Sequence, residues 1–469
     1  MTTYYGLNPS FCFSSPLPLL ASPIARARRF EIFDDAGRPI GEASLLSEGW
    51  PVEDGRRHGV RLLEGLPISD AARAYRDWLV ILGPSGAGSL SWTRRPTSAA
   101  LRMLDVLPFT PQAPRLHIPS LEALASLRPR VFRTLDLGWQ ARRDRRPDWS
   151  RGRVLPSDLI QGEEMAVEIQ AKISRLLHCN LWWNAPPRFE LSVAEYETRL
   201  EEYLVAIRDS VELPPVIEYV NEIWNAGFPV HGWLHEPDGH PGRPEDVVAW
   251  SWHRFAAREI QTLKRVADRV FGQPRFLGAR PYWLFVGGQL TVPSHMDRLL
   301  SELAGLGVTP DLAGPALYVT PLKAHKEEWE ATGSCPTQDE LRASCLARLE
   351  EIATGINDPT RDPMGPLAQH AAILARHRVP YFACYEAGQS LLADGHPWRR
   401  AAIEAQRTEW MGELYRGIRR VAEAAGVDVL NWYSACTIQD PRDPRLNVHG
   451  LLEGVGAPLL SKALAARGD

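Results

Sequence analysis

The chain of 469 residues contains no apolar run long enough to cross a membrane as a helix. Its first residues also lack a basic segment followed by an apolar one, because prolines and serines interrupt the apolar residues between positions 11 and 24. The sequence therefore predicts no membrane partner and shows no export signal. We expect a cytoplasmic protein from the chain as given, or a secreted one if a signal peptide has been removed.

An excess of charge of one sign is absent too. The 53 Lys and Arg residues and 57 Asp and Glu residues leave a formal net charge of -4, and both signs are interspersed. A protein that binds nucleic acid would be expected to gather basic residues along one face. The balance of charge therefore argues against nucleic acid and against a charged membrane surface as partners.

Cysteine is scarce, and the six cysteines show no C-x-x-C spacing of the kind that holds zinc. The simplest expectation is free thiols in a reducing compartment. His231, His235 and His240 lie close together in the sequence, but the glycines and prolines among them favour a loop, and no acidic ligand has a matching spacing. We therefore predict no metal ion and no cofactor.

Nucleotide-binding signatures are missing as well. Residues 83–88 are rich in glycine, but no Lys-Ser or Lys-Thr pair follows them, so a hairpin turn is expected there. No glycine-rich loop of the dinucleotide-binding type joins a strand to a helix. This disfavours an open doubly wound sheet, which is the main alternative fold.

The sequence does contain a regular series of short apolar strands separated by helical segments. Helices are indicated by apolar residues at helical spacing and by capping boxes, such as the one from Ser192 to Glu195. Alternating strands and helices predict an α/β fold, here a (β/α)8 TIM barrel. The eight expected strands are 3–8, 131–136, 179–184, 216–222, 275–280, 312–319, 379–386 and 427–432.

One segment departs from this alternation. Residues 40–118 contain apolar runs and turn signals with little helical period, which predicts a β-rich insertion after the first strand. The expected domains are therefore a barrel formed by residues 1–39 and 119–469 and a β-rich subdomain formed by residues 40–118. The sequence assigns no function to this subdomain.

Two of the expected strands end on a glutamate. Glu222 follows Asn221 at the end of the fourth strand, and Glu386 ends the seventh. A buried carboxylate is costly unless it is paired or used in chemistry. Because the strands of a barrel converge at their carboxyl ends, the two glutamates are expected to face each other across its mouth. Such a pair can break a glycosidic bond, since one carboxyl group gives a proton while the other attacks the anomeric carbon.

Tryptophan is abundant, with 16 residues, and several lie near expected strand ends. An indole ring suits the flat apolar face of a sugar, and its N–H is left over for a hydroxyl group. Trp183, Trp224 and Trp432 are the candidates for contact with the substrate. They predict several sugar subsites, and hence a polysaccharide or oligosaccharide substrate.

Residues 218–225 read Glu-Tyr-Val-Asn-Glu-Ile-Trp-Asn. This stretch resembles the Glu-Tyr-x-Asn-Glu-x-Trp-Asn motif of bacterial members of clan A, the 4/7 superfamily of retaining glycoside hydrolases. The order of strands over about residues 119–469 is similar to that clan as well. The resemblance implies that Glu222 is the general acid/base and Glu386 the nucleophile.

The resemblance also implies roles for residues on neighbouring strands. Asn221 would hydrogen-bond the sugar 2-hydroxyl, Arg133 would support the nucleophile, and Tyr318 would lie beside it. Arg133 is equally suited to a structural ion pair. Further contacts to the sugar are implied for Trp183, Asn184 and Trp432, the last as an aromatic floor.

The sequence thus predicts a retaining glycoside hydrolase that acts by double displacement, with its two carboxyl groups about 5–5.5 Å apart. Two alternatives stay open. A non-catalytic glycan-binding barrel would use the carboxylates for structure, and a transglycosylase would use the same residues for another acceptor. The sugar, its linkage, endo or exo action and the oligomeric state are not defined by the sequence.

Overall fold

The computed structural model describes backbone and side chains over twelve stretches of the chain, and only the backbone of residues 118–120 and of the strands before residue 109. The predicted strand at 275–280 lies outside the described residues, as do His235 and His240. The twelve stretches are residues 121–135, 166–188, 191–225, 227–228, 230–231, 251–272, 281–354, 364–391, 393, 395–435, 450–452 and 459–468.

The chain divides into two compact units. One comprises residues 1–15, 124–153 and 171–469, and the other comprises residues 16–123 and 154–170. The second unit contains a seven-stranded antiparallel sheet in the order β3-β2-β4-β7-β6-β5-β8. The domain boundaries predicted at residues 40 and 118 stay predictions. The strands of this sheet are β2 (Ala27–Phe33), β3 (Pro39–Ser44), β4 (Arg57–Gly65), β5 (Ala71–Tyr75), β6 (Trp78–Leu82), β7 (Ala87–Trp92) and β8 (Leu107–Pro108).

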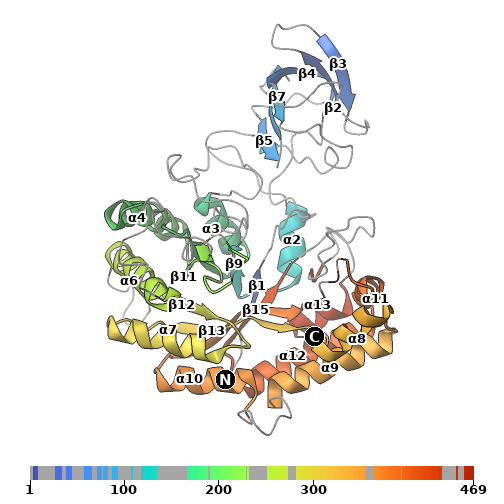
Figure 1. The fold of residues 1–469 in the computed structure, drawn as a ribbon. Helices are drawn as coiled ribbons and strands as arrows, with labels where there is room; N and C mark the ends of the chain where they lie inside the picture. Colours follow the sequence, from blue (N-terminus) through green and yellow to red (C-terminus); the bar gives the residue numbers. More distant parts are fainter. Residues whose placement is uncertain are drawn as a thin grey trace. The chain divides into compact units, whose positions relative to one another are not determined.

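The first unit is built on a sheet in which every pairing is parallel (Figure 1). The pairings run β13-β12-β11-β10-β9-β1-β16-β15, and β15 pairs with β13 again, so the sheet closes on itself. The predicted α/β class is confirmed. Its strands are β1 (Tyr4–Asn8), β9 (Val131–Arg133), β10 (Asn180–Ala185), β11 (Val216–Tyr219), β12 (Trp283–Gly288), β13 (Leu312–Pro315), β14 (Leu317–Val319), β15 (Tyr381–Gln389) and β16 (Val429–Tyr433).

Two strands differ from the sequence prediction. The fifth strand is β12, which pairs with β11 and β13 in the place predicted for residues 275–280. Its four consecutive apolar residues, 283–286, form a denser run than the predicted segment, which carries arginine at both ends. The predicted sixth strand consists of β13 and β14, and both parts pair with β15.

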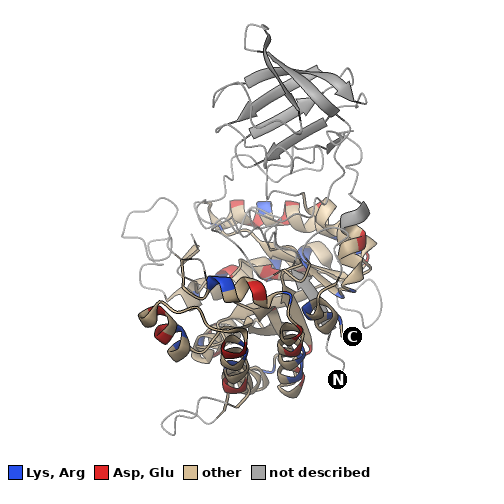
Figure 2. Ribbon diagram, turned by 90° about the vertical axis from the view of Figure 1, so that its right-hand side faces the viewer, with Lys and Arg blue, Asp and Glu red and all other residues tan. Residues whose placement is uncertain are grey.

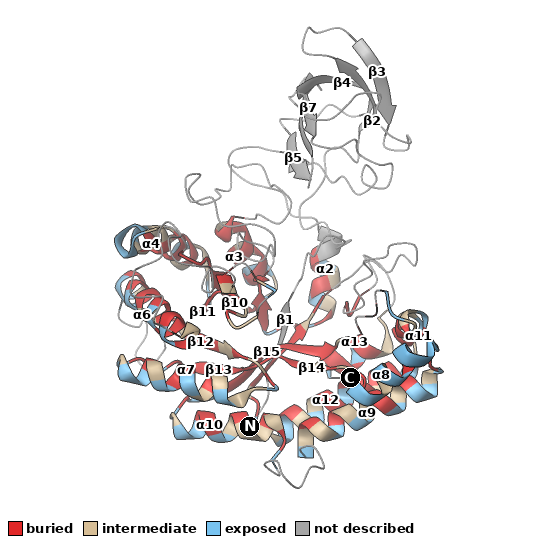
Figure 3. Cartoon of the chain, in the orientation of Figure 1, coloured by how far each residue is buried: buried red, intermediate tan, exposed pale blue. Residues whose placement is uncertain are grey.

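Helices lie around this sheet, and the helices carry both buried and exposed residues (Figures 1 and 3). The capping box from Ser192 to Glu195 begins α4 as predicted. No helix among the described residues combines the length and the apolarity needed to cross a membrane. The helices are α2 (Ile118–Ser126), α3 (Val167–Leu176), α4 (Val193–Ser210), α6 (Trp252–Phe271), α7 (Pro293–Gly305), α8 (Lys323–Thr332), α9 (Gln338–Thr354), α10 (Pro366–Arg376), α11 (Arg399–Ala405), α12 (Glu409–Ala424) and α13 (Ser461–Arg467).

Charged residues of both signs are mixed along the helices, as Figure 2 shows. This agrees with the interspersed charges of the sequence. Pairs such as Lys264 with Asp268 and Arg348 with Glu351 link successive turns of one helix. Exposed pairs of this kind contribute little to stability.

The interior of the closed sheet is filled by side chains from successive strands. Because residues two apart on a strand point to the same side, each strand contributes its alternate residues. The cluster comprises Val131, Trp182, Val216, Phe285, Leu312, Ala316, Ala383, Tyr385 and Val429. This layer shows which strand positions face inward. The polar residues described next lie on the same inner side of the sheet.

Candidate active site

Arg133 is the centre of a buried polar cluster. It ends β9, and its side chain is completely buried. Its Nε and Nη2 donate to the two oxygens of Glu218 at 2.9 and 3.0 Å, and its Nη1 donates to Glu386 Oε1 at 2.7 Å. Nη2 also donates to Asn221 Oδ1 at 3.0 Å. One arginine thereby joins β9, β11, β15 and the turn after β11.

Glu218 is a member of this cluster that the sequence analysis did not select. It lies on β11 and is 2% exposed, and it accepts a further bond from the indole N–H of Trp182 at 2.8 Å. Inside a protein a carboxylate of this kind must be paired. The signal was available, because Glu218 is two residues from the inward-facing Val216 and therefore shares its side of the strand.

Glu386 reaches the interior through an irregularity in β15. Alternation from Ala383 and Tyr385 would turn Glu386 outward, but the register with β16 shifts between Cys384 and Ala387. Such a bulge lets neighbouring side chains face the same side. Glu386 is 4% exposed, and its Oε2 accepts a bond from the hydroxyl of Tyr318 at 2.7 Å.

Glu222 lies in the turn after β11 and is held by neutral donors. The hydroxyl of Tyr385 donates to Oε1 at 2.8 Å, and the amide of Asn225 donates to Oε2 at 2.7 Å. Val220 and Glu222 have φ angles of 40° and 48°. Left-handed backbone is costly for such residues, above all for a β-branched one, and it concentrates at functional sites.

Burial raises the pKa of both carboxyl groups. At Glu386, Arg133 opposes this rise, the charge of Glu222 adds to it, and Tyr318 opposes it. Arg133 gives its charged hydrogen bond to Glu386, whereas the bonds to Glu222 come from uncharged groups. Because a charged donor stabilises an ionised carboxylate more strongly, we assign the negative charge to Glu386 and the proton of the pair to Glu222.

The retained proton should make stability depend on pH. Between the ordinary Glu pKa of about 4.3 and the raised pKa of the buried carboxyl pair, the folded state binds a proton that the unfolded state lacks. The free energy of unfolding should therefore fall as pH rises through this range, by at most about 1.4 kcal/mol per pH unit. Urea unfolding at pH 5 to 8 should show that the free energy of unfolding falls less steeply with pH in Glu386→Gln than in the wild type.

Two comparisons make this measurement specific. Burial also raises the pKa of Glu259 to about 7, but Glu259 titrates in both proteins and cancels in their difference. Exchanging the exposed Glu328 for Gln should leave the slope of the wild type unchanged. Equal slopes for wild type and Glu386→Gln would contradict the shared proton.

Two predicted aromatic contacts face away from the cluster. Trp432 packs against Tyr415 of α12 at 5.1 Å between ring centroids, and its N–H donates to Ala466 of α13. Trp183 packs against Tyr203 of α4 at 5.5 Å. Both predictions are corrected for the same reason, since each tryptophan occupies the outward position next to an inward residue of its strand.

The aromatic residue that β16 presents on the inner side is Tyr433. It shares its side of the strand with Val429, and its ring meets that of Tyr318 edge to face at 6.0 Å. Tyr318 in turn bonds Glu386. The sequence could have indicated Tyr433, because Val429, residue 431 and Tyr433 are each two residues apart on β16 and therefore point to the same side of the sheet.

Asn184 and Trp224 have polar atoms that find no hydrogen-bond partner among the described residues. Asn184 is completely buried on β10, and both its Oδ1 and its Nδ2 are unpaired. The indole N–H of Trp224, two residues after Glu222, is buried and unpaired too. Unpaired buried polar groups are rare and call for an explanation such as a bound ligand.

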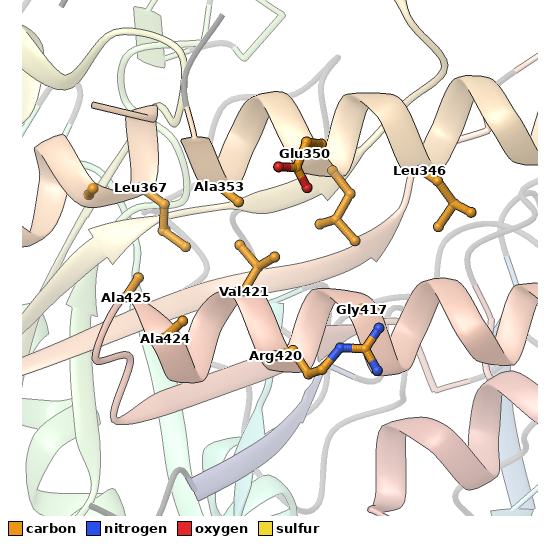
Figure 4. A pocket seen from close by; sticks show the side chains of 11 residues that line it. Leu346, Glu350, Ala353, Leu367, Gly417, Arg420, Val421, Ala424 and Ala425 are labelled. Carbon is orange, nitrogen blue, oxygen red and sulfur yellow. The ribbon is translucent and has the colours of Figure 1, made fainter. Parts of the chain in front are cut away.

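A separate cavity of about 450 Å³ lies among α9, α10 and α12 (Figure 4). Its walls are mainly leucine and alanine side chains, with Glu350 and Arg420 as the charged residues. None of the predicted site residues lines it. Ligand sites usually add several convergent polar groups to an apolar lining, so the Arg133 cluster is the better candidate for chemistry.

Among the described residues, no group of three or more His, Cys, Asp or Glu side chains is placed to hold a metal ion. The buried cysteines Cys179, Cys345 and Cys384 are free thiols, and burial raises the pKa of each. These thiols are therefore core residues rather than nucleophiles.

No protein-family model matches this chain, and no curated protein sequence matches it. Among solved structures, it is similar to a family 51 α-L-arabinofuranosidase from Thermotoga petrophila, with 12% identity, 77% of this chain and 66% of that chain covered, and a TM-score of 0.45. A psychrophilic family 10 endo-β-1,4-xylanase gives 11% identity, coverages of 75% and 92%, and a TM-score of 0.40. A broad-specificity family 5 endoglucanase from Clostridium acetobutylicum gives 9% identity, with 76% of this chain and 90% of that chain covered, and a TM-score of 0.38.

All three neighbours are glycoside hydrolases, the class of enzyme that the sequence resembles. This chain spans 62% to 66% of the length of the arabinofuranosidases that it matches. The chemistry of the site must therefore follow from its own geometry.

Proposed function

We propose that this protein is a retaining glycoside hydrolase on a (β/α)8 barrel, with Glu386 as nucleophile and Glu222 as general acid/base. The observation that carries the proposal is the unequal surroundings of the two carboxyl groups. Glu386 has a charged donor, Arg133, at 2.7 Å, whereas Glu222 has the neutral donors Tyr385 and Asn225. Two carboxyl groups whose environments favour opposite protonation states match the needs of an acid and a nucleophile.

The proposed reaction has two steps. Glu386 attacks the anomeric carbon and forms a glycosyl ester while the bond to the leaving oxygen breaks, and Glu222 gives that oxygen its proton. Glu222 then takes a proton from water, whose oxygen attacks the same carbon and releases Glu386. Arg133 and Tyr318 hold Glu386 by its two oxygens, which orients it for attack.

The proposed substrate is a carbohydrate chain. Asn184 and Trp224 offer buried donors and acceptors that are unpaired within the described part of the chain, and sugar hydroxyl groups can pair with both kinds. The ring of Tyr433, packed edge to face on Tyr318, is the aromatic candidate for contact with the sugar in place of Trp432. A transglycosylase would share all these residues and differ in the acceptor, so the assay must follow both water and sugar acceptors.

The test is turnover of a panel of nitrophenyl glycosides and polysaccharides by the wild type and Glu222→Gln. General acid catalysis contributes roughly 10²- to 10⁴-fold, so Glu222→Gln should lose about that factor on polysaccharides. It should lose far less on a dinitrophenyl glycoside, whose leaving group departs without a proton. NMR of the first product formed should show the anomeric configuration of the substrate.

Other outcomes would replace the proposal. A first product of opposite configuration would mean direct displacement by water, with an inverting mechanism. A wild type that turns over nothing but binds a glycan of the panel would support the glycan-binding barrel. Replacing the exposed Glu328 by Gln is the matched control and should leave every rate unchanged.

A further inference from the structure

Tyr385 is a buried side chain that neither the sequence motif nor the proposed mechanism assigns a role. It is 1% exposed, and its hydroxyl donates to Glu222 Oε1 at 2.8 Å. The bulge in β15 places it beside Glu386, its neighbour in the chain, within the same interior. It is therefore adjacent to both carboxyl groups of the site.

The ring of Tyr385 is fixed by its packing. The guanidinium carbon of Arg133 lies 5.0 Å from the ring centroid, and the ring of Phe285 lies 5.8 Å away. A cation over an aromatic face and an aromatic neighbour both restrain the ring. The hydroxyl consequently approaches Glu222 from one fixed direction.

The hydroxyl is also a dependable donor. Burial, then the charges of Glu222 and Glu386, raise the pKa of Tyr385 well above its usual value, so the phenol keeps its proton. A hydrogen bond given to a carboxylate favours the ionised form and opposes the effect of burial at Glu222. Asn225 gives the second bond, to the other oxygen.

We propose that Tyr385 is a positioning residue for Glu222, which it holds in place for proton transfer. The inference rests on the proposed role of Glu222 as general acid/base. A second consequence is that Tyr385 keeps Glu222 from binding its proton too tightly to release it. Among the described residues, the titratable and charged groups that surround Glu222 are Arg133 of β9, Glu218 of β11, Tyr318 of β14, and Tyr385 and Glu386 of β15.

The first test requires no turnover. Glutamate carrying ¹³C at its side-chain carboxyl carbon is incorporated into wild type and Tyr385→Phe, and the Glu222 signal is assigned by its loss in Glu222→Gln. Losing the hydroxyl should raise the pKa of Glu222 by about one unit, which corresponds to about a tenfold change in proton affinity. The control is Tyr196→Phe, which removes a buried hydroxyl bonded to the Pro186 carbonyl oxygen. It should leave the Glu222 signal unchanged.

The second test uses the enzyme reaction. Tyr385→Phe should lower kcat/KM about tenfold on a glycoside with a poor leaving group, and change it less than about twofold on a dinitrophenyl glycoside. The alkaline limb of the pH profile on the poor substrate should move up by about one pH unit. If Tyr385 merely supported the fold, its replacement would lower kcat/KM equally on both glycosides and would not move the alkaline limb of the pH profile.

The outcomes separate this inference from the function on which it rests. An unchanged pKa of Glu222 in Tyr385→Phe, or equal losses on both substrates with an unmoved limb, overturns the role of Tyr385. A wild type without turnover on any glycoside overturns the proposed function, and the titration then decides alone whether Tyr385 controls Glu222. A raised pKa together with a selective loss on the poor substrate establishes the role.

Discussion

Replacing Glu386 by glycine should abolish turnover, with a loss of roughly 10⁴- to 10⁶-fold, because the variant lacks the group that attacks the anomeric carbon. Azide should then restore part of the activity on a dinitrophenyl glycoside. The anion fits where the carboxylate was and attacks from the same side, so the product should be a glycosyl azide of inverted configuration. NMR of the product and the azide dependence of the rate measure this directly.

The matched control is Glu259→Gln. Glu259 is also a buried glutamate paired with an arginine, Arg188, at 3.1 Å, but it lies on α6 and contacts neither carboxyl group of the site in the described structure. Its exchange should leave kcat on the dinitrophenyl glycoside within about threefold of the wild type. Full activity in Glu386→Gly, or equal losses in both variants, would remove Glu386 from the mechanism.

Arg133→Met should cost about 3–5 kcal/mol in the free energy of unfolding. Methionine approximates the stem of arginine but leaves Glu218 and Glu386 buried without their cation. Uncompensated buried carboxylates are expensive, and neither is exposed enough for water to replace the lost bonds. Urea unfolding of wild type and variant at pH 7 gives the difference.

A surface arginine provides the comparison. Arg199 pairs with Glu202 one turn along α4, with 32% of its side chain exposed, so Arg199→Met should cost no more than about 1 kcal/mol. Adding Glu218→Gln to Arg133→Met should recover part of the loss, because one of the stranded charges is then removed. An Arg133→Met protein as stable as Arg199→Met would mean that the cluster is not held by charge.

How far the sequence could predict the site depends on the kind of pattern involved. Glu222 and Glu386 were identifiable because each ends an apolar strand, whereas Arg133, Asn221 and Tyr318 were implied by the resemblance to clan A. The structure brings the five residues into one cluster. Their separation along the chain reaches 253 residues for Arg133 and Glu386. Only the convergence of barrel strands made their proximity predictable.

Other features were hidden because they depend on local register. Trp183 and Trp432 each lie one residue away from an inward-facing position of their strand, so they point outward. Composition does not reveal this difference. The bulge that brings Glu386 to the same side as Tyr385 is visible only in the register of β15 with β16. A mainly apolar stretch at 275–280 competed with the true fifth strand, and only the pairing with β11 and β13 resolves the choice.

The shared arginine has a consequence for inhibitors. With the proton on Glu222, Arg133 neutralises one of the two ionised glutamates, Glu218 and Glu386, and one negative charge is left in excess within a buried space. A cation placed there is worth more than it would be in water. Iminosugars, whose ring nitrogen is protonated, supply that cation where an oxocarbenium ion would develop in the reaction. On the proposed mechanism, the geometry around Arg133 is therefore expected to favour charged sugar mimics over neutral ones of the same shape.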